Sequence, residues 1–301
     1  MPDADPPIDR REGLHGPDSM MWRVNREAVL LGSGPAALLL QIAHPLVAEG
    51  VAAHSDYEAD PFGRLRRTLR TTLDLVFGDG PAAERAVRRL NAVHARVRGE
   101  VRDPTARIAS GADRYRALDP ELLLWVQATL VIMSVRAYRS WVGPLSAEGC
   151  ERLWQETRRT GRLLGIPLER SPSDWPALVE WFEAQISPGG PVVVTDTALR
   201  LSGSILHPPI PYLPRRLMDL AMLPGLGLLP PSVRDGFGIA WGPGHELAAR
   251  TLGTGLHAWV RSLPRSWRAM PQARAAERRT RRPIFGDARS GHGWATIHVR
   301  H

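Results

Sequence analysis

Apolar residues recur every three or four positions along most of the chain, the spacing that places them on one face of a helix. Between residues 61 and 77 they repeat every fourth position, so we predict a helix there, ended by Gly78-Asp79-Gly80. A second helix is expected over 81–101. Its apolar face would be formed by Val87, Leu90, Val93, Val97 and Val101.

Capping residues mark the expected helix starts. Asp60 and Asp119 are each followed by proline, and Ser146 and Ser173-Asp174 precede apolar periodic segments. The most apolar helix is expected over 35–54, with a kink near Ala43–His44 because Pro45 lacks a backbone N–H. The triplet at 192–194 is a candidate strand, but a strand without a partner is not stable.

These elements predict an all-α protein with a single helical domain of about ten helices over residues 20–270. The sequence shows neither alternating strands nor a repeat of fixed period. Residues 1–19 are expected to be a flexible N-terminal arm. Residues 271–301 are rich in arginine and poor in core residues, which predicts a largely disordered tail.

The segment 28–48 carries no formal charge and is long enough to cross a bilayer. Gly34, Pro35, Gln41 and His44 interrupt it, which favours a buried core helix, so we expect no stable membrane insertion. The N-terminus has no basic region followed by an apolar stretch, and the lone Cys150 cannot form an internal disulfide. Both features favour a cytoplasmic protein.

The formal net charge is +8, and every basic residue other than histidine is an arginine. Such an excess suits an anionic ligand, a membrane surface or nucleic acid. The arginines are spread along the whole chain, apart from one dense run at 278–282, and no nucleic-acid-binding motif accompanies them. We therefore expect no nucleic acid partner.

Three histidines lie within apolar helical patterns. His44 and His54 are ten residues apart, about 15 Å along a helix, so they cannot ligate one ion. Each is readily explained as a core histidine hydrogen-bonded to backbone. His94 lies between Leu90 and Val97 on an apolar face, where a buried imidazole needs partners for both nitrogens. Iron is one such partner, although a satisfied core histidine explains this pattern as well.

A polar group on the preceding helix changes this balance. Arg64, Arg67 and Thr68 lie at the edge of the leucine face, and facing a buried histidine they would form a small polar spot in an apolar pocket. Oxygen chemistry at a haem requires such a pocket. The alternative is a solvated basic face. The sequence contains no H-E-x-x-H, no pair of E-x-x-H motifs, no G-x-S-x-G and no P-loop.

The run ALLLQIAHPLVAEGV at 37–51, followed by His54-Ser55, resembles the family of MpaB-like oxygenases and rubber oxygenases (latex-clearing proteins). The resemblance extends over about 20–270 and is loose in the C-terminal half. It continues through Asp60-Pro61, Arg64-Leu65, Thr68, His94, Val97-Arg98-Gly99, Asp119-Pro120-Glu121-Leu122-Leu123 and Trp125-Val126.

This resemblance implies an all-helical fold of the rubber-oxygenase type. The rubber-cleaving members hold haem b through one axial histidine and split isoprenoid double bonds with O2. His94 matches the axial histidine and thus the iron ligand. His44 and His54 match the histidine motif of the family, expected to shape the haem pocket, and Arg98 is grouped with them as cofactor-binding.

The resemblance also assigns the catalytic side of the haem. Arg64, Arg67 and Thr68 match the polar cluster opposite the axial histidine. Position 67 differs from the rubber-cleaving branch, which has a lysine able to reach iron there; because arginine stays protonated, the sixth iron position is expected to be open or water-filled. Pro35 stands where relatives often have arginine, and Gln127 where many have histidine.

The secretion signal of the rubber-cleaving branch is absent, so the polymer is not the expected substrate. The sequence instead predicts a haem b-dependent oxygenase that acts with O2 on a hydrophobic, unsaturated, terpenoid-like small molecule. One alternative is a haem or hydrophobic-ligand binding protein without turnover. Another is a helical interaction module without a cofactor.

Overall fold

The computed structural model describes residues 8–54, 61–208 and 214–280. Within them the chain forms fifteen α-helices, two short 3₁₀ helices and one two-stranded sheet. The first half contains α1 (Met20–Asn25), η1 (Ala28–Ser33), α2 (Gly34–Ile42), α3 (Pro45–His54), α4 (Pro61–Phe77), α5 (Gly80–Arg96), β1 (Arg98–Glu100), α6 (Pro104–Ser110), β2 (Arg114–Arg116) and α7 (Pro120–Trp141). The second half contains α8 (Ala147–Leu163), η2 (Leu168–Arg170), α9 (Trp175–Ile186), α10 (Asp196–Leu206), α11 (Arg215–Leu226), α12 (Pro231–Gly236), α13 (Pro243–Ser262), α14 (Arg265–Arg268) and α15 (Pro271–Thr280). The all-α prediction is confirmed, with more helices than the ten expected.

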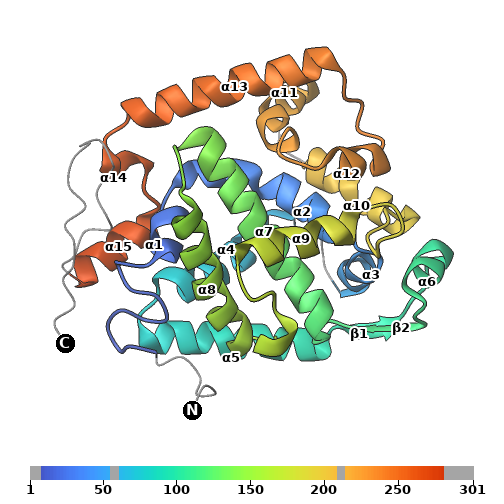
Figure 1. The fold of residues 1–301 in the computed structure, drawn as a ribbon, viewed down its shortest axis with the longest axis horizontal. Coiled ribbons are helices and arrows are strands. Elements are labelled where there is room, and N and C mark those ends of the chain that lie inside the picture. Colours follow the sequence, from blue (N-terminus) through green and yellow to red (C-terminus); the bar gives the residue numbers. More distant parts are fainter. Residues whose placement is uncertain (1–7, 55–60, 209–213, 281–301) are drawn as a thin grey trace.

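Helix α7 forms the centre of the molecule and contacts α2, α8, α9 and α13 (Figure 1). It is apolar on nearly all sides, as a helix surrounded by other helices must be. Its Trp125 is buried, stacks on Phe182 of α9 and donates from the indole Nε1 to the Gln41 carbonyl of α2, at 3.1 Å. The main core is therefore built outward from α7.

Within the described residues, two parts of the chain have the length and apolar composition of a membrane span. One is α7, and 67% of its most apolar stretch of 18 residues is buried inside the protein. The other is residues 28–54, where the helices on either side of residues 43–44 meet at 108°. Pro45 explains this corner, since it cannot donate to the preceding turn and forces His44 away from helical geometry. The predicted kink is confirmed as a break between α2 and α3.

The predicted helix starts are confirmed wherever the structure describes them. Asp119 accepts a hydrogen bond from the Glu121 N–H at 2.9 Å, and Ser146 accepts from the Gly149 N–H at 3.1 Å. Asp174 caps α9 in the same way. Asp60 lies outside the described residues, but the helix it was expected to start begins at residue 61. Local capping chemistry is therefore sufficient to place these starts.

The predicted helix over 81–101 is wrong at its end. Helix α5 stops at Arg96, and Arg98–Glu100 pairs antiparallel with Arg114–Arg116. Val101, expected on the helix face, is instead buried beneath this hairpin. A Cβ on Gly99 would lie 2.7 Å from the Tyr115 hydroxyl oxygen, so the hairpin depends on a glycine there. The expectation of a chain without strands is corrected accordingly, while residues 192–194 stay outside any strand.

The C-terminal half also divides differently from the prediction. Residues 243–262 form one long helix, α13. Residues 271–280, expected to be disordered, form α15, which buries Ala273 and Ala276 against Trp22 and Phe77. The remaining residues of the predicted tail, 281–301, lie outside the described part. The small side chains let α15 approach Trp22 and Phe77 closely, and this close packing compensates for its low apolar content.

The N-terminal arm is likewise ordered where the structure describes it. Residues 9 and 13 form an isolated bridge, and Arg11 and Arg279 each donate a guanidinium hydrogen bond to the carbonyl oxygen of the other. Arg279 also donates to the Phe77 carbonyl at the end of α4, at 2.7 Å. The two ends of the described chain thus meet over α4. The expectation of a flexible arm fails for residues 8–19, and residues 1–7 are outside the described range.

A buried cluster of charges also fastens the C-terminal segment. Glu27 lies between Arg268, with Nε–Oε2 at 3.3 Å, and Arg26, with Nη1–Oε1 at 3.8 Å. All three side chains are almost fully buried. The Met270 N–H donates to the Arg26 carbonyl at 2.7 Å, so backbone and side chains meet at the same place. A buried carboxylate between two arginines is costly to disturb, because each cation depends on it.

His15, within the segment expected to be a flexible arm, is buried against α8. Its Nε2 lies 2.9 Å from the Thr160 hydroxyl. Burial lowers the pKa of His15 from its usual 6.5 to about 4. The folded protein therefore holds this imidazole neutral over a range in which the unfolded chain protonates it.

We expect this histidine to make stability pH-dependent. The unfolded chain binds a proton at His15 below about pH 6.5, whereas the folded chain does so only near pH 4. The contribution of the neutral His15 to the free energy of unfolding is thus complete above pH 6.5. It is lost as the pH falls towards 4, by up to about 3 kcal/mol. Urea unfolding of wild type and His15→Asn at pH 7.5 and 5 checks this. The variant should lose less stability on acidification, and an equal loss in both proteins would contradict the account.

Candidate cofactor site

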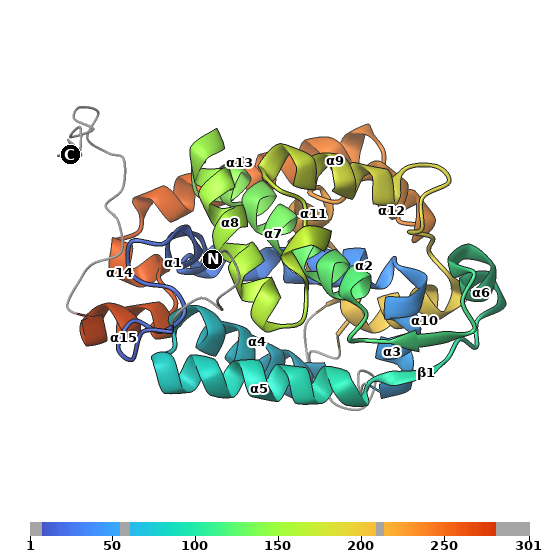
Figure 2. The ribbon, with the colours of Figure 1, turned by 60° about the horizontal axis from the view of Figure 1, so that its bottom comes forward.

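His94 lies in the last turn of α5, in the antiparallel pair of helices that α4 and α5 form (Figure 2). Its side chain is half-buried, and burial lowers the pKa of the imidazole, which keeps it neutral near pH 7. The Nδ1 atom is fully buried and has no hydrogen-bond partner among the described residues. A neutral histidine with an unsatisfied buried nitrogen is unusual and calls for an explanation.

The apolar side chains around His94 are not completely covered. Leu90 and Val97 are half-buried, and Val93 is 49% exposed. Val97 contacts α3, since a Cβ on Gly50 would lie 3.4 Å from its Cγ1 atom. The end of α5 therefore offers aliphatic surface and a neutral imidazole together, next to the junction with α3 and β1.

The polar cluster predicted on α4 has a different environment from the one expected. The side chains of Arg67 and Thr68 are exposed rather than at the edge of a buried pocket. The side chain of Arg64 lies outside the described set, but its backbone is helical. Arg64 and His94 are equally far along their helices from the Gly78–Gly80 turn, so their backbones lie at the same level of the α4–α5 pair. The dry polar spot is thus absent from the described side chains.

His54 and Arg98 do come together. The His54 ring nitrogen Nε2 lies 3.1 Å from the Arg98 carbonyl oxygen, and the ring meets Tyr115 edge-on at 6.2 Å between centroids. His54 is exposed at the end of α3, and Arg98 begins β1 just after the helix that carries His94. Three of the predicted cofactor-binding residues therefore gather around the α5–β1 junction.

His44 lies apart from them, at the corner between α2 and α3. Its Nδ1 accepts a hydrogen bond from the Leu46 N–H at 3.3 Å, and its ring lies 6.1 Å from that of Trp125. Burial lowers its pKa to about 4, despite the opposing effect of Asp119. These contacts are those of a helix-capping core histidine, as one interpretation of the sequence has it.

Two polar residues near the predicted site were not among the sequence candidates. Asn91, one turn before His94 on α5, and Gln127 on α7 each have a buried side-chain oxygen without a hydrogen-bond partner in the described structure. Their amide nitrogens bond to α8, Asn91 to the Leu163 carbonyl and Gln127 to the Thr157 carbonyl, both at 3.0 Å. The spacing of Asn91 from His94 is the signal that could have identified it, because residues three apart share a helix face.

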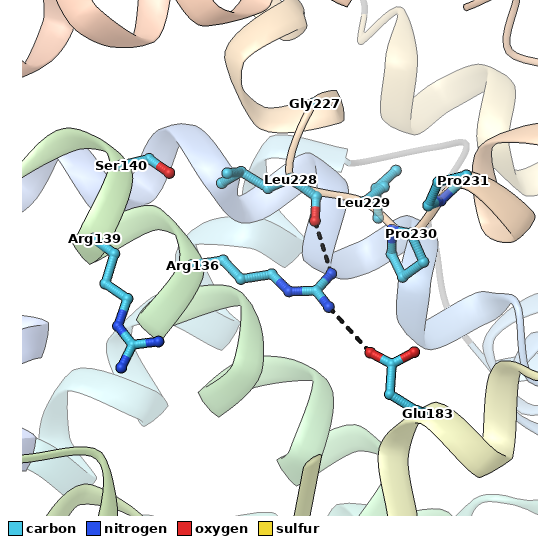
Figure 3. Close-up of a pocket in the computed structure, with 9 residues that line it drawn as sticks. All are labelled: Arg136, Arg139, Ser140, Glu183, Gly227, Leu228, Leu229, Pro230 and Pro231. Carbon is cyan, nitrogen blue, oxygen red and sulfur yellow. Dashed lines mark hydrogen bonds and ion pairs between the residues drawn. The ribbon is translucent and has the colours of Figure 1, made fainter. Parts of the chain in front are cut away.

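A separate pocket of about 480 Å³ opens between α7, α9 and the 227–231 segment (Figure 3). Arg136 crosses it, donating to the Leu228 carbonyl at 2.9 Å and pairing with Glu183 at 3.4 Å. None of the predicted site residues lines this pocket. Its size alone does not make it the active site, because the half-buried Arg136 that crosses it is already engaged by Leu228 and Glu183.

The described residues contain no group of three or more His, Cys, Asp or Glu side chains that could hold a metal ion. Haem iron needs only one protein ligand, typically a neutral imidazole beside apolar surface. His94 has the neutral ring and the partly uncovered aliphatic neighbours that such a ligand requires, and its unpaired Nδ1 leaves a nitrogen for the second hydrogen bond that a ligating imidazole makes. The residues present at the end of α5 are therefore chemically suited to haem.

Comparison with known proteins places this geometry in a family. The model of the catalytic domain of the ER-bound oxygenase mpaB/B' and rubber oxygenase family matches residues 22–262. Two curated relatives, uncharacterized proteins Rv2237 of Mycobacterium tuberculosis and Mb2261 of Mycobacterium bovis, are each 30% identical over 159 residues, or 50% of this chain. The aligned part spans 58% of the length of these relatives. No solved structure matches significantly. The chain belongs to the mpaB and rubber oxygenase family, and residues 22–262 form its oxygenase catalytic domain.

Proposed function

We propose that this oxygenase uses haem b to oxidise a hydrophobic, unsaturated small molecule with O2. The observation that carries the proposal is His94, a neutral and half-buried histidine whose buried Nδ1 has no partner among the described residues. It lies within the matched oxygenase domain, and the resemblance in sequence implies that it is the axial ligand. Haem b, when bound, supplies the reactivity towards O2 that amino-acid side chains lack.

The chain's own residues would bind the haem and orient the substrate. His94 would hold the iron, and the aliphatic side chains of Leu90, Val93 and Val97 would contact the haem or an apolar substrate and exclude water. Arg67 cannot replace the lysine of the rubber-cleaving branch as a ligand, because its guanidinium remains protonated. It would act with Thr68 as a hydrogen-bond donor.

Oxygen consumption tests this function. The full chain, expressed with haem supplied and supported by a chemical reductant, is mixed with an apolar terpenoid alkene and, in parallel, with its saturated analogue. The proposal expects consumption of O2 and a product heavier by oxygen with the alkene only. Use of ¹⁸O₂ shows whether the added oxygen comes from O2.

A binding protein without turnover is favoured by one observation, the exposure of Arg67 and Thr68, which leaves them outside a dry pocket. In that case the protein would take up haem and show no alkene-dependent O2 consumption. Failure to bind haem at all, in a folded protein, would contradict the haem oxygenase and the haem-binding alternative, and would leave a hydrophobic-ligand binding protein or a helical interaction module.

A further inference from the structure

Two unsatisfied polar atoms lie one helical turn apart on α5. The Nδ1 atom of His94 and the Oδ1 atom of Asn91 are both fully buried, and neither has a hydrogen-bond partner within the described residues. One can donate and the other can only accept. Residues three apart on a helix have neighbouring side chains, although these two atoms are not hydrogen-bonded to each other in the structure. Because α8 holds the Asn91 amide, rotation of the His94 side chain is the movement that would bring them together.

The orientation of the Asn91 amide is already determined. Its Nδ2 donates to the Leu163 carbonyl of α8 at 3.0 Å, and only the nitrogen end of the amide can make that bond. The oxygen end therefore points elsewhere and needs a donor, because an unpaired buried acceptor costs about 1–3 kcal/mol. Flipping the amide would set two acceptors against each other at Leu163.

The tautomer of His94 leads to the same pair. A neutral imidazole carries a proton on only one of its two nitrogens. If Nδ1 carries it, Asn91 supplies the acceptor, and Nε2 retains the lone pair that a metal requires. Histidines that ligate metals generally donate their other ring N–H to an oxygen, which fixes the tautomer and the ring orientation.

We propose that Asn91 is the positioning residue for His94, accepting a hydrogen bond from Nδ1–H so that Nε2 is unprotonated and directed away from α5. This inference rests on the proposed function for its purpose, since it explains how a lone histidine is prepared to ligate haem. The hydrogen bond itself does not depend on haem and is tested separately. Gln127, whose Oε1 is also buried and unpaired in the described structure, is the competing acceptor.

The first experiment reads the tautomer in the full chain expressed without added haem. Long-range ¹H–¹⁵N correlation spectra of labelled histidine distinguish Nδ1–H from Nε2–H imidazole, and His94→Gln identifies the signal. The wild type is expected to show Nδ1–H at His94, and Asn91→Leu should shift the signal towards Nε2–H. Asn25→Leu is the matched control, because Asn25 is also half-buried and donates to a backbone carbonyl, that of Met21.

An Nε2–H signal at His94 in the wild type would overturn the proposal. A signal that responds to Gln127→Leu but not to Asn91→Leu would overturn it as well. Asn91→Asp keeps an acceptor at the same position, so it should retain the Nδ1–H tautomer. It also keeps the test decisive if the leucine variant fails to fold.

The second experiment uses the haem-loaded protein and measures the iron–histidine stretching frequency and the reduction potential. A stronger acceptor at Nδ1–H makes the imidazole a stronger ligand. Asn91→Asp is therefore expected to raise the frequency and lower the potential, and Asn91→Leu to do the opposite. Shifts of the same sign in both variants, or shifts as large in Asn25→Leu, would contradict a positioning role.

The two experiments separate the inference from the proposed function. If the protein binds no haem and the tautomer still depends on Asn91, the hydrogen bond is correct and the haem assignment is wrong. If haem binds through His94, but the tautomer and the iron–histidine stretching frequency are unchanged in the Asn91 variants, the haem assignment holds and the positioning role fails.

Discussion

Replacing His94 by alanine is expected to abolish the haem absorption band of the purified protein while the helical circular dichroism stays unchanged. The band depends on one protein ligand to iron, and His94 is the residue that the resemblance assigns to this role. The side chain is half-buried near a helix end, so its loss should lower the free energy of unfolding by only about 1 kcal/mol. Absorption spectra of both proteins, expressed with haem supplied, measure the effect.

His207→Ala serves as the control for this substitution. His207 bonds to Asp219 at 2.8 Å, far from α5 in sequence, and was not among the predicted ligands. Its replacement should leave the haem content unchanged. Full haem content with an unaltered spectrum in His94→Ala would show that the iron ligand lies elsewhere.

Replacing Glu27 by glutamine is expected to lower the free energy of unfolding by about 3–5 kcal/mol. The substitution conserves the shape of the side chain and removes the negative charge between Arg26 and Arg268, both of which are buried. Arg26 keeps its pair with Glu277, at 3.6 Å, so the loss falls mainly on Arg268. The same site joins the start of η1 to the segment that leads into α15. Urea unfolding at pH 7.5 measures the loss, and limited proteolysis shows whether the C-terminal segment becomes accessible first.

Glu84→Gln is the matched control, because its pair with Arg88 is exposed on α5, with side-chain exposures of 51% and 67%. A surface pair of this kind contributes less than about 0.5 kcal/mol. An equally small effect of Glu27→Gln would mean that the buried cluster does not hold the C-terminal segment in place.

The parts of the fold that depend on local chemistry were predictable from the sequence. Asp119, Ser146 and Asp174 cap helices at their predicted positions because a capping side chain bonds within its own turn. The break at Pro45 was predictable for a similar reason, since proline acts on the residues immediately before it.

The errors concern segments that depend on distant partners. Val97 and Val101 continue the apolar helical pattern across residues 98–100, and only pairing with 114–116 makes these residues a strand. The arginine-rich segment 271–280 has low apolar content, and its order comes from contacts with Trp22, Arg26 and Phe77. His15 resembled a solvated residue because its partner, Thr160, is far away in the sequence. Periodicity carries no information about such contacts.

The candidate site was predictable in part. The position of His94 on a helix face followed from residue spacing, and its role followed from the resemblance to the family. The exposure of Arg67 and Thr68 could not be predicted from the sequence. The leucine pattern of α4 indicates which face of the helix is apolar, but not how far neighbouring elements bury the residues at the edge of that face. Asn91 escaped notice because an asparagine on a helix suggests no chemistry until its unpaired oxygen is seen beside His94.

The central claim is that a haem b is held by this chain at His94. The most direct measurement is the pyridine haemochrome spectrum of the full-length wild type, combined with iron analysis, after expression with haem supplied. The account predicts the spectrum of haem b and about one iron per chain. A folded, colourless protein without iron would contradict it.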